Sequence, residues 1–205
     1  MTSRNLFLST VLAADGFYCV VGLKKGTPRQ QFVETLDEVN NLVNSLLDDG
    51  FDTYFGCAKY ETDDGRTAKN AKWFKSFWLD LDCGEGKSYE SQAQALTSLR
   101  DFCRETKLPK PIVVNSGRGV HAYWPLLEPI GYNDWKPVAE ALKKLCATHA
   151  LHADPSVTAD AARILRVPNT ANFKNPEAPY AVKVMSMADA IEFETFKNLV
   201  GYDMM

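Results

Sequence analysis

Residues 77–83 have the sequence Phe-Trp-Leu-Asp-Leu-Asp-Cys, an apolar, strand-like run that carries Asp80 and Asp82. Side chains alternate between the two faces of a strand, so both carboxylates leave the same face side by side. Two adjacent anions on an apolar strand repel each other and are costly to bury unless a cation lies between them. This stretch therefore predicts a sheet strand whose acid pair binds a divalent cation.

A glycine-rich turn and a histidine follow further along the chain. The turn comprises Ser116, Gly117, Arg118 and Gly119, and His121 comes two residues after it. Glycines permit positive φ and close backbone approach, so the turn can offer N–H groups to an anion beside the imidazole. Acid pair, turn and histidine together predict a metal-dependent site that handles phosphates.

Length and composition are those of an ordinary globular protein. The 205 residues are 45% hydrophobic and 24% charged, which allows one substantial core. No apolar run approaches the roughly 20 residues that a membrane span requires. The N-terminal residues carry a single charge, Arg4, so we interpret them as the first helix or strand of the fold rather than a signal peptide. Five cysteines without a C-x-x-C pair fit reduced thiols in a cytosol.

The formal net charge of −3 does not by itself indicate a nucleic-acid-binding protein. The distribution of charge is more informative, because residues 66–75 and 163–174 contain several Arg and Lys residues and no acid. One such run is usually a solvated face. Two of them, on either side of the acid pair, favour contact with phosphates.

The hydrophobic periodicity predicts alternating helices and strands. We expect helices at 28–49, 88–106 and 133–149 and a last one capped by residues 186–189, and strands at 53–60, 76–82, 112–114, 120–126, 163–167 and 180–185. The strands at 112–114 and 120–126 form a predicted hairpin. Because other strands are separated by helices, the pattern predicts an α+β protein with a mixed sheet. No repeat or linker divides the chain, so residues 1–205 are predicted to form one domain.

Three other site types share parts of this pattern. Phosphatases with a D-x-D nucleophile place Gly and Thr after the strand, whereas Cys83 and Gly84 stand here. Residues 84–88 imitate the end of a P-loop without its first glycine, although Lys87 could still reach a phosphate. A helical spacing of Cys146, His149 and His152 puts the first and third on different faces, so structural zinc is not predicted.

A third acid and two arginines complete the candidate site. Asp154 precedes a proline, which on its own is typical of a turn. Arg163 and Arg166 follow at a spacing that would place them on opposite faces of a strand. The spacing predicts that only one of them meets the substrate.

Together these residues resemble the catalytic core of the archaeo-eukaryotic primase (AEP) superfamily, the primase-polymerases of phages, plasmids and related mobile elements. The family's first motif, an apolar strand ending in Asp-x-Asp, is similar to residues 78–82. Its second motif, S-G-x-G-x-H, is matched by residues 116–121. Its third motif is an acid followed by an Arg- and Val-rich segment and Pro-x-Thr-x-Asn-x-Lys, matched by Asp154 and residues 162–174.

The resemblance implies an N-terminal α/β lobe packed on a lobe related to the RNA-recognition motif (RRM-like), with the active cleft between them. It implies that Asp80, Asp82 and Asp154 are catalytic and hold two Mg²⁺ or Mn²⁺ ions. The implied nucleotide-binding residues are Ser116, Gly117, Arg118, Gly119, His121, Arg163, Arg166 and Lys174. The basic runs would then follow a template backbone, with Tyr60, Trp73 or Tyr123 available for base stacking.

The implied activity is that of a DNA primase and DNA polymerase: template-directed, metal-dependent nucleotidyl transfer for primer synthesis and extension in phage or plasmid replication. The implied partners are a single-stranded DNA template and primer, NTP or dNTP, and a helicase or C-terminal helical accessory domain, with no membrane. The implied location is the cytoplasm of a bacterial or archaeal cell. Two alternatives remain open: a metal-dependent phosphatase or nuclease that uses the acid pair, and a catalytically inactive nucleic-acid-binding module.

Overall fold

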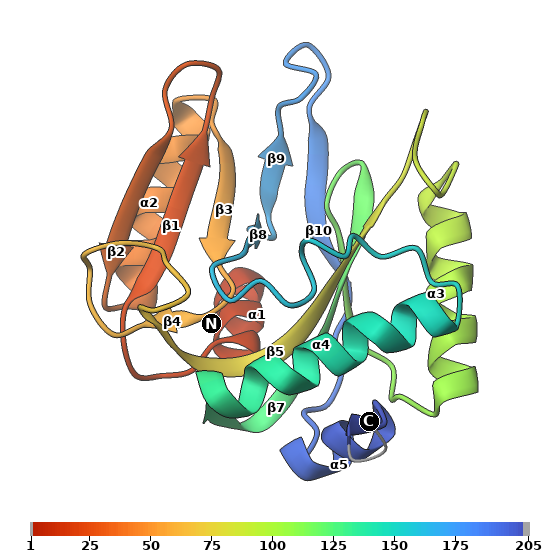
Figure 1. The fold of residues 1–205 in the computed structure, drawn as a ribbon. Helices are drawn as coiled ribbons and strands as arrows, with labels where there is room; N and C mark the ends of the chain where they lie inside the picture. Colours follow the sequence, from red (N-terminus) through yellow and green to blue (C-terminus); the bar gives the residue numbers. More distant parts are fainter. Residues whose placement is uncertain (1, 203–205) are drawn as a thin grey trace.

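The computed structural model describes residues 2–202 and contains two β-sheets with helices packed around them (Figure 1). The helices within this range are α1 (Ser3–Val11), α2 (Leu36–Asp48), α3 (Gln92–Thr106), α4 (Tyr132–Thr148) and α5 (Phe193–Leu199). The strands are β1 (Tyr18–Leu23), β2 (Arg29–Val33), β3 (Asp52–Gly56), β4 (Lys59–Tyr60), β5 (Ala71–Asp82), β6 (Ile112–Asn115), β7 (Gly119–Gly131), β8 (Ile164–Arg166), β9 (Thr170–Asn172) and β10 (Tyr180–Ser186). None of the helices in this range is long and apolar enough to cross a membrane.

The first sheet has the order β2-β1-β3-β8 and the second has the order β4-β5-β7-β6-β10-β9. In the second sheet β5 leads through α3 to β6, and β7 lies between the two strands, which is a split βαβ arrangement. The α+β class is confirmed. The ladders between the strands of the described residues are all antiparallel. Between residues 2 and 202, the parallel pairing expected of a mixed sheet occurs only in isolated bridges such as Cys83 with Tyr89.

One cluster of buried side chains extends through both sheets. Phe7 of α1 lies between them, with its ring centroid 5.7 Å from that of Phe55 on β3 and 5.2 Å from that of Tyr123 on β7. On the other side of β5, Trp135 of α4 stacks on Phe74 at 4.4 Å. Such aromatic pairs add to the free energy of burial. Phe7 therefore joins β3 of the first sheet to β7 of the second. The single domain of residues 1–205 stays a prediction.

The predicted helix at 28–49 is wrong in its first part, because residues 29–33 form β2 and pair with β1. The capping box of the helix is at Thr35, whereas a helix starting at residue 28 would have its cap at Thr27. Thr35 caps α2 by accepting from the Glu38 amide at 3.2 Å, and the Glu38 carboxylate accepts from the Thr35 amide at 2.9 Å. Thr27 and Gln30 have the same spacing, but the segment after them pairs as an edge strand instead.

Two further differences concern the C-terminal third. The last helix begins at Phe193 rather than after Ser186, because β10 continues to Ser186 and residues 187–192 are irregular. The short strand β9 was not predicted from the sequence. It has three residues and pairs with β10, so its formation depends on a tertiary partner rather than on a local pattern.

Lys59 is the most unusual buried group in the described structure. Its side chain is 0% exposed, its Nζ has no hydrogen-bond partner among the described residues, and that atom lies 3.1 Å from the centroid of the Tyr18 ring. Burial lowers the pKa of Lys59 to about 8 from 10.5. Between these values the unfolded chain binds more protons than the folded one, so the free energy of unfolding rises as pH increases from about 8 to about 10.5.

We expect Lys59→Met to raise the free energy of unfolding at pH 7 by about 1–3 kcal/mol, because the variant no longer buries a charge. The variant should also lose the rise in stability above pH 8. Chemical denaturation between pH 7 and pH 10 measures both effects. Lys69→Met, at an exposed position on the neighbouring loop, is the control. A destabilised Lys59→Met protein would mean that contact with Tyr18 outweighs the cost of desolvation.

Candidate active site

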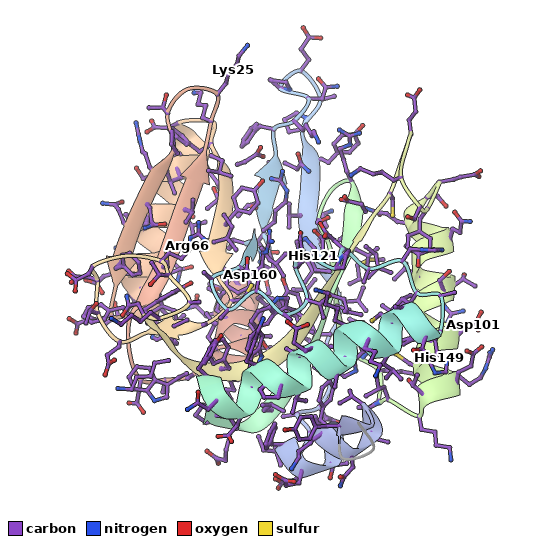
Figure 2. The ribbon with its side chains drawn as sticks, in the orientation of Figure 1. Lys25, Arg66, Asp101, His121, His149 and Asp160 are labelled. Atoms are coloured by element: carbon purple, nitrogen blue, oxygen red, sulfur yellow. The ribbon has the colours of Figure 1, made fainter. Side chains whose placement is uncertain are left out.

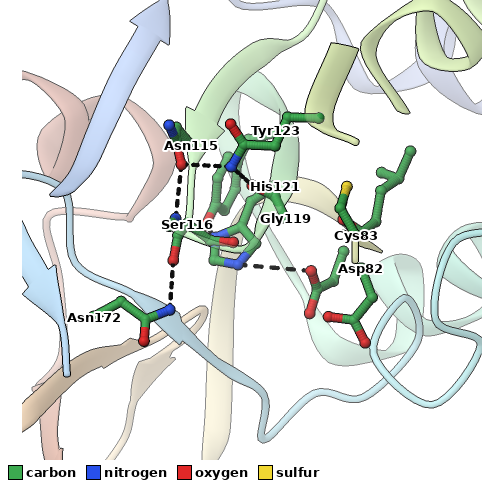
Figure 3. Close-up of polar contacts among 12 residues, drawn as sticks. Asp82, Cys83, Asn115, Ser116, Gly119, His121, Tyr123 and Asn172 are labelled. Carbon is green, nitrogen blue, oxygen red and sulfur yellow. Dashed lines mark hydrogen bonds and ion pairs between the residues drawn. The ribbon is translucent and has the colours of Figure 1, made fainter. Parts of the chain in front are cut away.

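The acid pair lies at the end of β5, beside β7. Asp80 pairs with His121 and Asp82 pairs with Gly119 in an antiparallel ladder. The predicted strand and its same-face acids are confirmed: Leu79 and Leu81 are fully buried, whereas the Asp80 side chain is 21% exposed and that of Asp82 is 50% exposed. Figure 3 shows the His121 ring and the Asp82 carboxylate facing the same space.

The electrostatics of the pair match the expected repulsion. Burial, followed by the charges of Asp82 and Asp154, raises the pKa of Asp80 to about 7. The Nζ atom of Lys87 lies 2.5 Å from Oδ2 of Asp82 and partly compensates its charge. Lys87, which the sequence suggested as a phosphate contact, therefore neutralises an acid here. A cation between the acids would relieve the remaining repulsion.

Asp154 lies next to the acid strand but its carboxylate is engaged elsewhere. Its backbone amide donates to the Asp80 carbonyl at 2.8 Å, while its Oδ1 accepts from the amide and hydroxyl of Ser156 at 2.8 and 2.7 Å. Accordingly, no group of three His, Cys, Asp or Glu side chains between residues 2 and 202 is arranged as a ready metal site. The donor set nevertheless fits Mg²⁺ or Mn²⁺ in chemistry, since it consists of carboxylate oxygens in a repulsive cluster.

The predicted hairpin is confirmed, with β6 and β7 antiparallel and Asn115 opposite Val120. The Ser116 amide donates to the Gly119 carbonyl at 3.0 Å, and the Gly117 amide donates to the Asn115 side chain at 2.7 Å. These two amides are thus used inside the turn and are not available to an anion in this conformation. The sequence did not reveal these two acceptors, the Gly119 carbonyl and the Asn115 side chain, and the nucleotide-binding role of Ser116 and Gly117 stays a prediction.

The two glycines of the turn have different roles. Gly117 has a φ of +94°, a left-handed conformation that favours glycine. Gly119 has no positive φ, but a Cβ there would lie 2.6 Å from the Leu81 carbonyl oxygen. Gly119 therefore permits the close approach of β7 to the acid-bearing end of β5.

His121 is buried and neutral. Burial, reinforced by the positive charge of Arg166, lowers its pKa to about 3. The Tyr123 hydroxyl lies 3.3 Å from Nδ1, and Nε2 lies 3.7 Å from Oδ1 of Asp80. Because burial keeps the Tyr123 phenol protonated, it can donate to Nδ1, which places the imidazole proton on Nε2. The contact with Asp80 is therefore not an ion pair, and Nε2 is positioned as a donor.

The cleft of about 310 Å³ beside the acids collects most of the predicted residues. Its lining includes Asp80, Asp82, Ser116, Arg118, His121, Arg163, Arg166 and Lys174. Asp154 lies in an adjoining pocket of about 450 Å³ that shares Asp82. Of the predicted site residues, Gly117 and Gly119 shape the turn and do not line the cleft.

Both arginines line this cleft, and which of them meets the substrate stays a prediction. Arg163 precedes β8 rather than lying within it, and strand alternation does not apply to it. Its Nη2 donates to the Ser156 carbonyl at 2.9 Å, and its Nε lies 3.2 Å from an Asp160 carboxylate oxygen without forming a hydrogen bond. Figure 2 shows Asp160 and His121 in the middle of the molecule.

Sequence comparisons identify no relative: no protein-family profile and no curated protein matches the chain. Solved structures do match. The AEP domain of the primase-polymerase of cyanophage S-2L superposes with a TM-score of 0.70 at 14% identity, covering 96% of both chains. This chain has the AEP primase fold.

Two structures of the primase RepB' share this AEP fold. One has a TM-score of 0.61 at 13% identity and covers 98% of this chain and 61% of that chain. The other is the catalytic domain in complex with initiator DNA. It has a TM-score of 0.59 at 15% identity, and the match covers 98% of this chain and 92% of that chain. The expected fold is therefore confirmed by superposition.

Sequence reasoning missed the residues that hold the AEP-fold cleft together. Asp52 binds Arg166 at 2.6 Å and also accepts from the Phe173 amide at 2.7 Å, while Tyr54 lies 4.8 Å below the Arg166 guanidinium. Asn172 donates to the Ser116 carbonyl at 3.1 Å (Figure 3). The first two lie on β3, far from the motifs in sequence, and no local pattern marks them.

Some further expectations are corrected by burial. Tyr60 and Tyr123 are 0% exposed and cannot stack on a base. The first basic run does not line the cleft: Arg66 donates to Gln30 and to the Ala162 carbonyl, and Lys72 pairs with Glu61. The second run supplies the basic side of the cleft, through Arg163, Arg166 and Lys174.

We expect Gly119→Ala to lower the free energy of unfolding by about 1–3 kcal/mol, because the new methyl group collides with the backbone of β5. Gly131→Ala, at the opposite end of β7, is the matched control, since a Cβ there has no neighbour within 4 Å. Urea denaturation of both variants measures the difference. Equal stabilities would show that β5 and β7 can separate at the acid pair without cost.

Proposed function

We propose that this protein is a nucleotidyltransferase that extends, and with its partners synthesises, primers on a single-stranded DNA template. One observation carries the proposal: the β5–β7 register sets Asp80 opposite His121 in a cleft that Arg163, Arg166 and Lys174 also line. Carboxylates for divalent cations thus adjoin cationic side chains for a polyphosphate. The AEP fold supports the same conclusion as an analogy.

The cationic side of the cleft binds the triphosphate of the incoming nucleotide. Arg166 is held by Asp52 and Tyr54, so its guanidinium is fixed before a ligand arrives. Arg118 is exposed, and its side chain forms no hydrogen bond or ion pair within residues 2–202, which leaves it free to close on the phosphates. Ser116 and the Nε2–H of neutral His121 supply hydrogen-bond donors.

Asp80 and Asp82, with Asp154 after release from Ser156, would hold two Mg²⁺ or Mn²⁺ ions. When bound, these ions activate a 3′-hydroxyl and neutralise the pyrophosphate that leaves. Asp80 and Asp82 orient the reacting groups through their fixed positions on β5. Lys87, which now pairs with Asp82, would be released toward a phosphate when a cation takes over that carboxylate.

The proposed partners are a DNA template and primer, NTP or dNTP, and a helicase or helical accessory domain. The RepB' structure with initiator DNA supports DNA as the polymer, since it has the same fold. A role in phage or plasmid replication in the cytoplasm of a bacterial or archaeal cell completes the proposal.

Primer extension tests the function directly. The full chain is incubated with a 5′-labelled primer on a longer template, with dNTPs or NTPs and Mg²⁺ or Mn²⁺. We expect products longer than the primer only when metal and complementary nucleotide are both present. An EDTA reaction and a reaction with a single non-complementary nucleotide are the controls.

The other outcomes identify the alternatives. Shortened DNA would indicate a nuclease, and hydrolysis of a simple phosphate monoester without extension would indicate a phosphatase. DNA binding without any reaction would indicate an inactive nucleic-acid-binding module. Each of these results contradicts the proposed nucleotidyl transfer.

A further inference from the structure

Another hollow of the described structure lies on the far face of the second sheet from the active cleft. It is a groove of about 570 Å³ between α3 and β10. Val113 lines this groove, whereas its neighbour Val114 pairs with His121, which lines the cleft. Because successive strand residues point to opposite faces, the sheet separates the two hollows.

The floor of the groove is apolar and partly exposed. It is formed by Leu96, Leu99, Cys103, Leu108, Val113 and Met185. The register of β10 shifts between Val184 and Ser186, and Met185 at this irregularity is 51% exposed. A bulge of this kind re-aims a side chain out of the sheet. Met187, just beyond, is 42% exposed, so flexible thioether side chains extend the apolar surface along one side.

The polar part of the lining has one sign of charge. Arg100 and Arg104 lie one turn apart on α3, and Lys110 lies in the segment before β6. No Asp or Glu lines the groove, although the chain as a whole has a net charge of −3. Of these three cations, only Arg104 forms an ion pair within residues 2–202, at 2.9 Å to Asp101, and Figure 2 places Asp101 at the outer edge of the molecule.

We propose that this groove binds an acidic, amphipathic segment of a partner protein. The segment would place two or three apolar side chains on the Leu and Met floor and its carboxylates against Arg100, Arg104 and Lys110, as amphipathic helices do in apolar grooves. Arginines also bind carboxylates with directed hydrogen bonds. Charge complementarity selects the acidic partner over a basic or neutral one.

The composition of the groove favours protein over nucleic acid. Single-stranded DNA is bound by cations combined with aromatic side chains on which bases stack. The lining of this groove contains no aromatic residue, and its cations are confined to the rim of an aliphatic floor. Since the active cleft opens on the other face, a bound segment would tether the enzyme without covering the site.

The test uses the full chain and a designed, fluorescein-labelled peptide of about 15 residues, long enough for a helix to form on binding. Leu residues follow i, i+3, i+4 and i+7 spacing, and Asp and Glu fill the other positions. One control peptide replaces each Leu with Ser, and a second replaces each acid with Lys. Fluorescence anisotropy measures the affinity of each peptide, and a labelled single-stranded oligonucleotide is titrated in parallel.

We expect the acidic amphipathic peptide to bind and both control peptides to bind at least about tenfold more weakly. Reversing two rim charges together, Arg100→Glu with Lys110→Glu, should weaken binding about tenfold or more, as should Met185→Asp in the floor. Lys144→Glu, at an exposed position of α4 outside the groove, is the matched control and should leave affinity unchanged. Primer extension on naked template should stay at the wild-type level in all of these proteins.

Three results would overturn the proposal. The first is equal affinity for the acidic and the Lys-substituted peptide. The second is peptide binding that the rim and floor variants leave unchanged while the proteins keep their wild-type melting temperature. The third is a loss of oligonucleotide binding in the double variant that matches the loss of peptide binding, which would assign the groove to nucleic acid. Loss of primer extension alone concerns the cleft and is measured separately.

Discussion

Asp80→Asn should abolish primer extension, with a loss of at least about a thousandfold in rate, and Asp82→Asn should do the same. Each substitution removes an anionic oxygen from the proposed metal ligands while keeping the size of the side chain. Loss of one such ligand costs several kcal/mol of transition-state stabilisation, and each 1.36 kcal/mol corresponds to a factor of ten. Extension rates with saturating Mn²⁺ measure the effect, and Asp189→Asn at an exposed position is the control.

The stability of the Asp80→Asn protein separates loss of function from loss of fold. Burial and like charges raise the pKa of Asp80 to about 7 from 3.8, so the folded chain binds more protons than the unfolded chain between these values. The free energy of unfolding of the wild type therefore falls as pH rises from about 4 through 7. The Asn variant escapes this fall and should be more stable than the wild type by about 1–3 kcal/mol at pH 8 in EDTA.

Two results would contradict this assignment of the acid pair. Extension by Asp80→Asn at a rate near that of the wild type would remove Asp80 from the reaction. A variant that is inactive and also much less stable at pH 8 would show that the carboxylate is a structural group. Melting temperatures at pH 5 and pH 8, determined on the same preparations as the rates, distinguish these two results.

Local patterns were sufficient for the parts of the fold in which neighbouring residues determine the structure. The alternation around Asp80 and Asp82 predicts their common face because it requires only the geometry of one strand. The Ser116–Gly119 turn predicts the β6–β7 hairpin because the loop itself brings the two strands together. The helix boundaries at Thr106 and Thr148 lie within a few residues of the prediction for the same reason.

The remaining differences arise where one local signal competes with tertiary pairing. Thr27 and Thr35 both begin a capping-box pattern, and only the pairing of Arg29–Val33 with β1 decides that the second is used. A single sequence contains no direct record of that pairing. Such a choice between a helix and an edge strand is made by the partner strand, which lies earlier in the chain.

In the candidate site, too, local sequence patterns do not reveal contacts that depend on tertiary pairing. The sequence identified most residues that line the cleft but not the residues that position them. Asp52 reaches Arg166 because β3 pairs with β8, across more than half of the chain. Arg163 joins the cleft because β8 begins one residue after it. The burial of His121, and hence its neutral state, depends on packing of both sheets around it.

His121→Ala should lower the efficiency of nucleotide use, kcat/KM, by about ten- to a hundredfold while leaving affinity for single-stranded DNA nearly unchanged. The neutral imidazole presents its Nε2–H to the cleft, and a hydrogen bond to a charged phosphate contributes about 1.5–3 kcal/mol. Since the pKa of His121 is about 3, the pH–rate profile of the wild type should show no His121 titration near 6.5.

Because His121 is only 3% exposed, its truncation also removes packing, and the control must reproduce that loss. Val114 lies directly opposite His121 on β6 and is fully buried, so Val114→Ala opens a neighbouring cavity without removing a polar group. Tyr123→Phe removes the hydroxyl that contacts Nδ1 and should produce a smaller loss in kcat/KM, because the imidazole stays in place but its tautomer is no longer fixed.

Melting temperature, DNA affinity and nucleotide kinetics are measured on one preparation of each protein, below the lowest melting temperature. If His121 acts on the nucleotide, His121→Ala loses kcat/KM and Val114→Ala does not, although both melt earlier than the wild type. If both variants lose stability while kcat/KM remains normal, His121 is a core residue whose place beside Asp80 has no part in nucleotide binding.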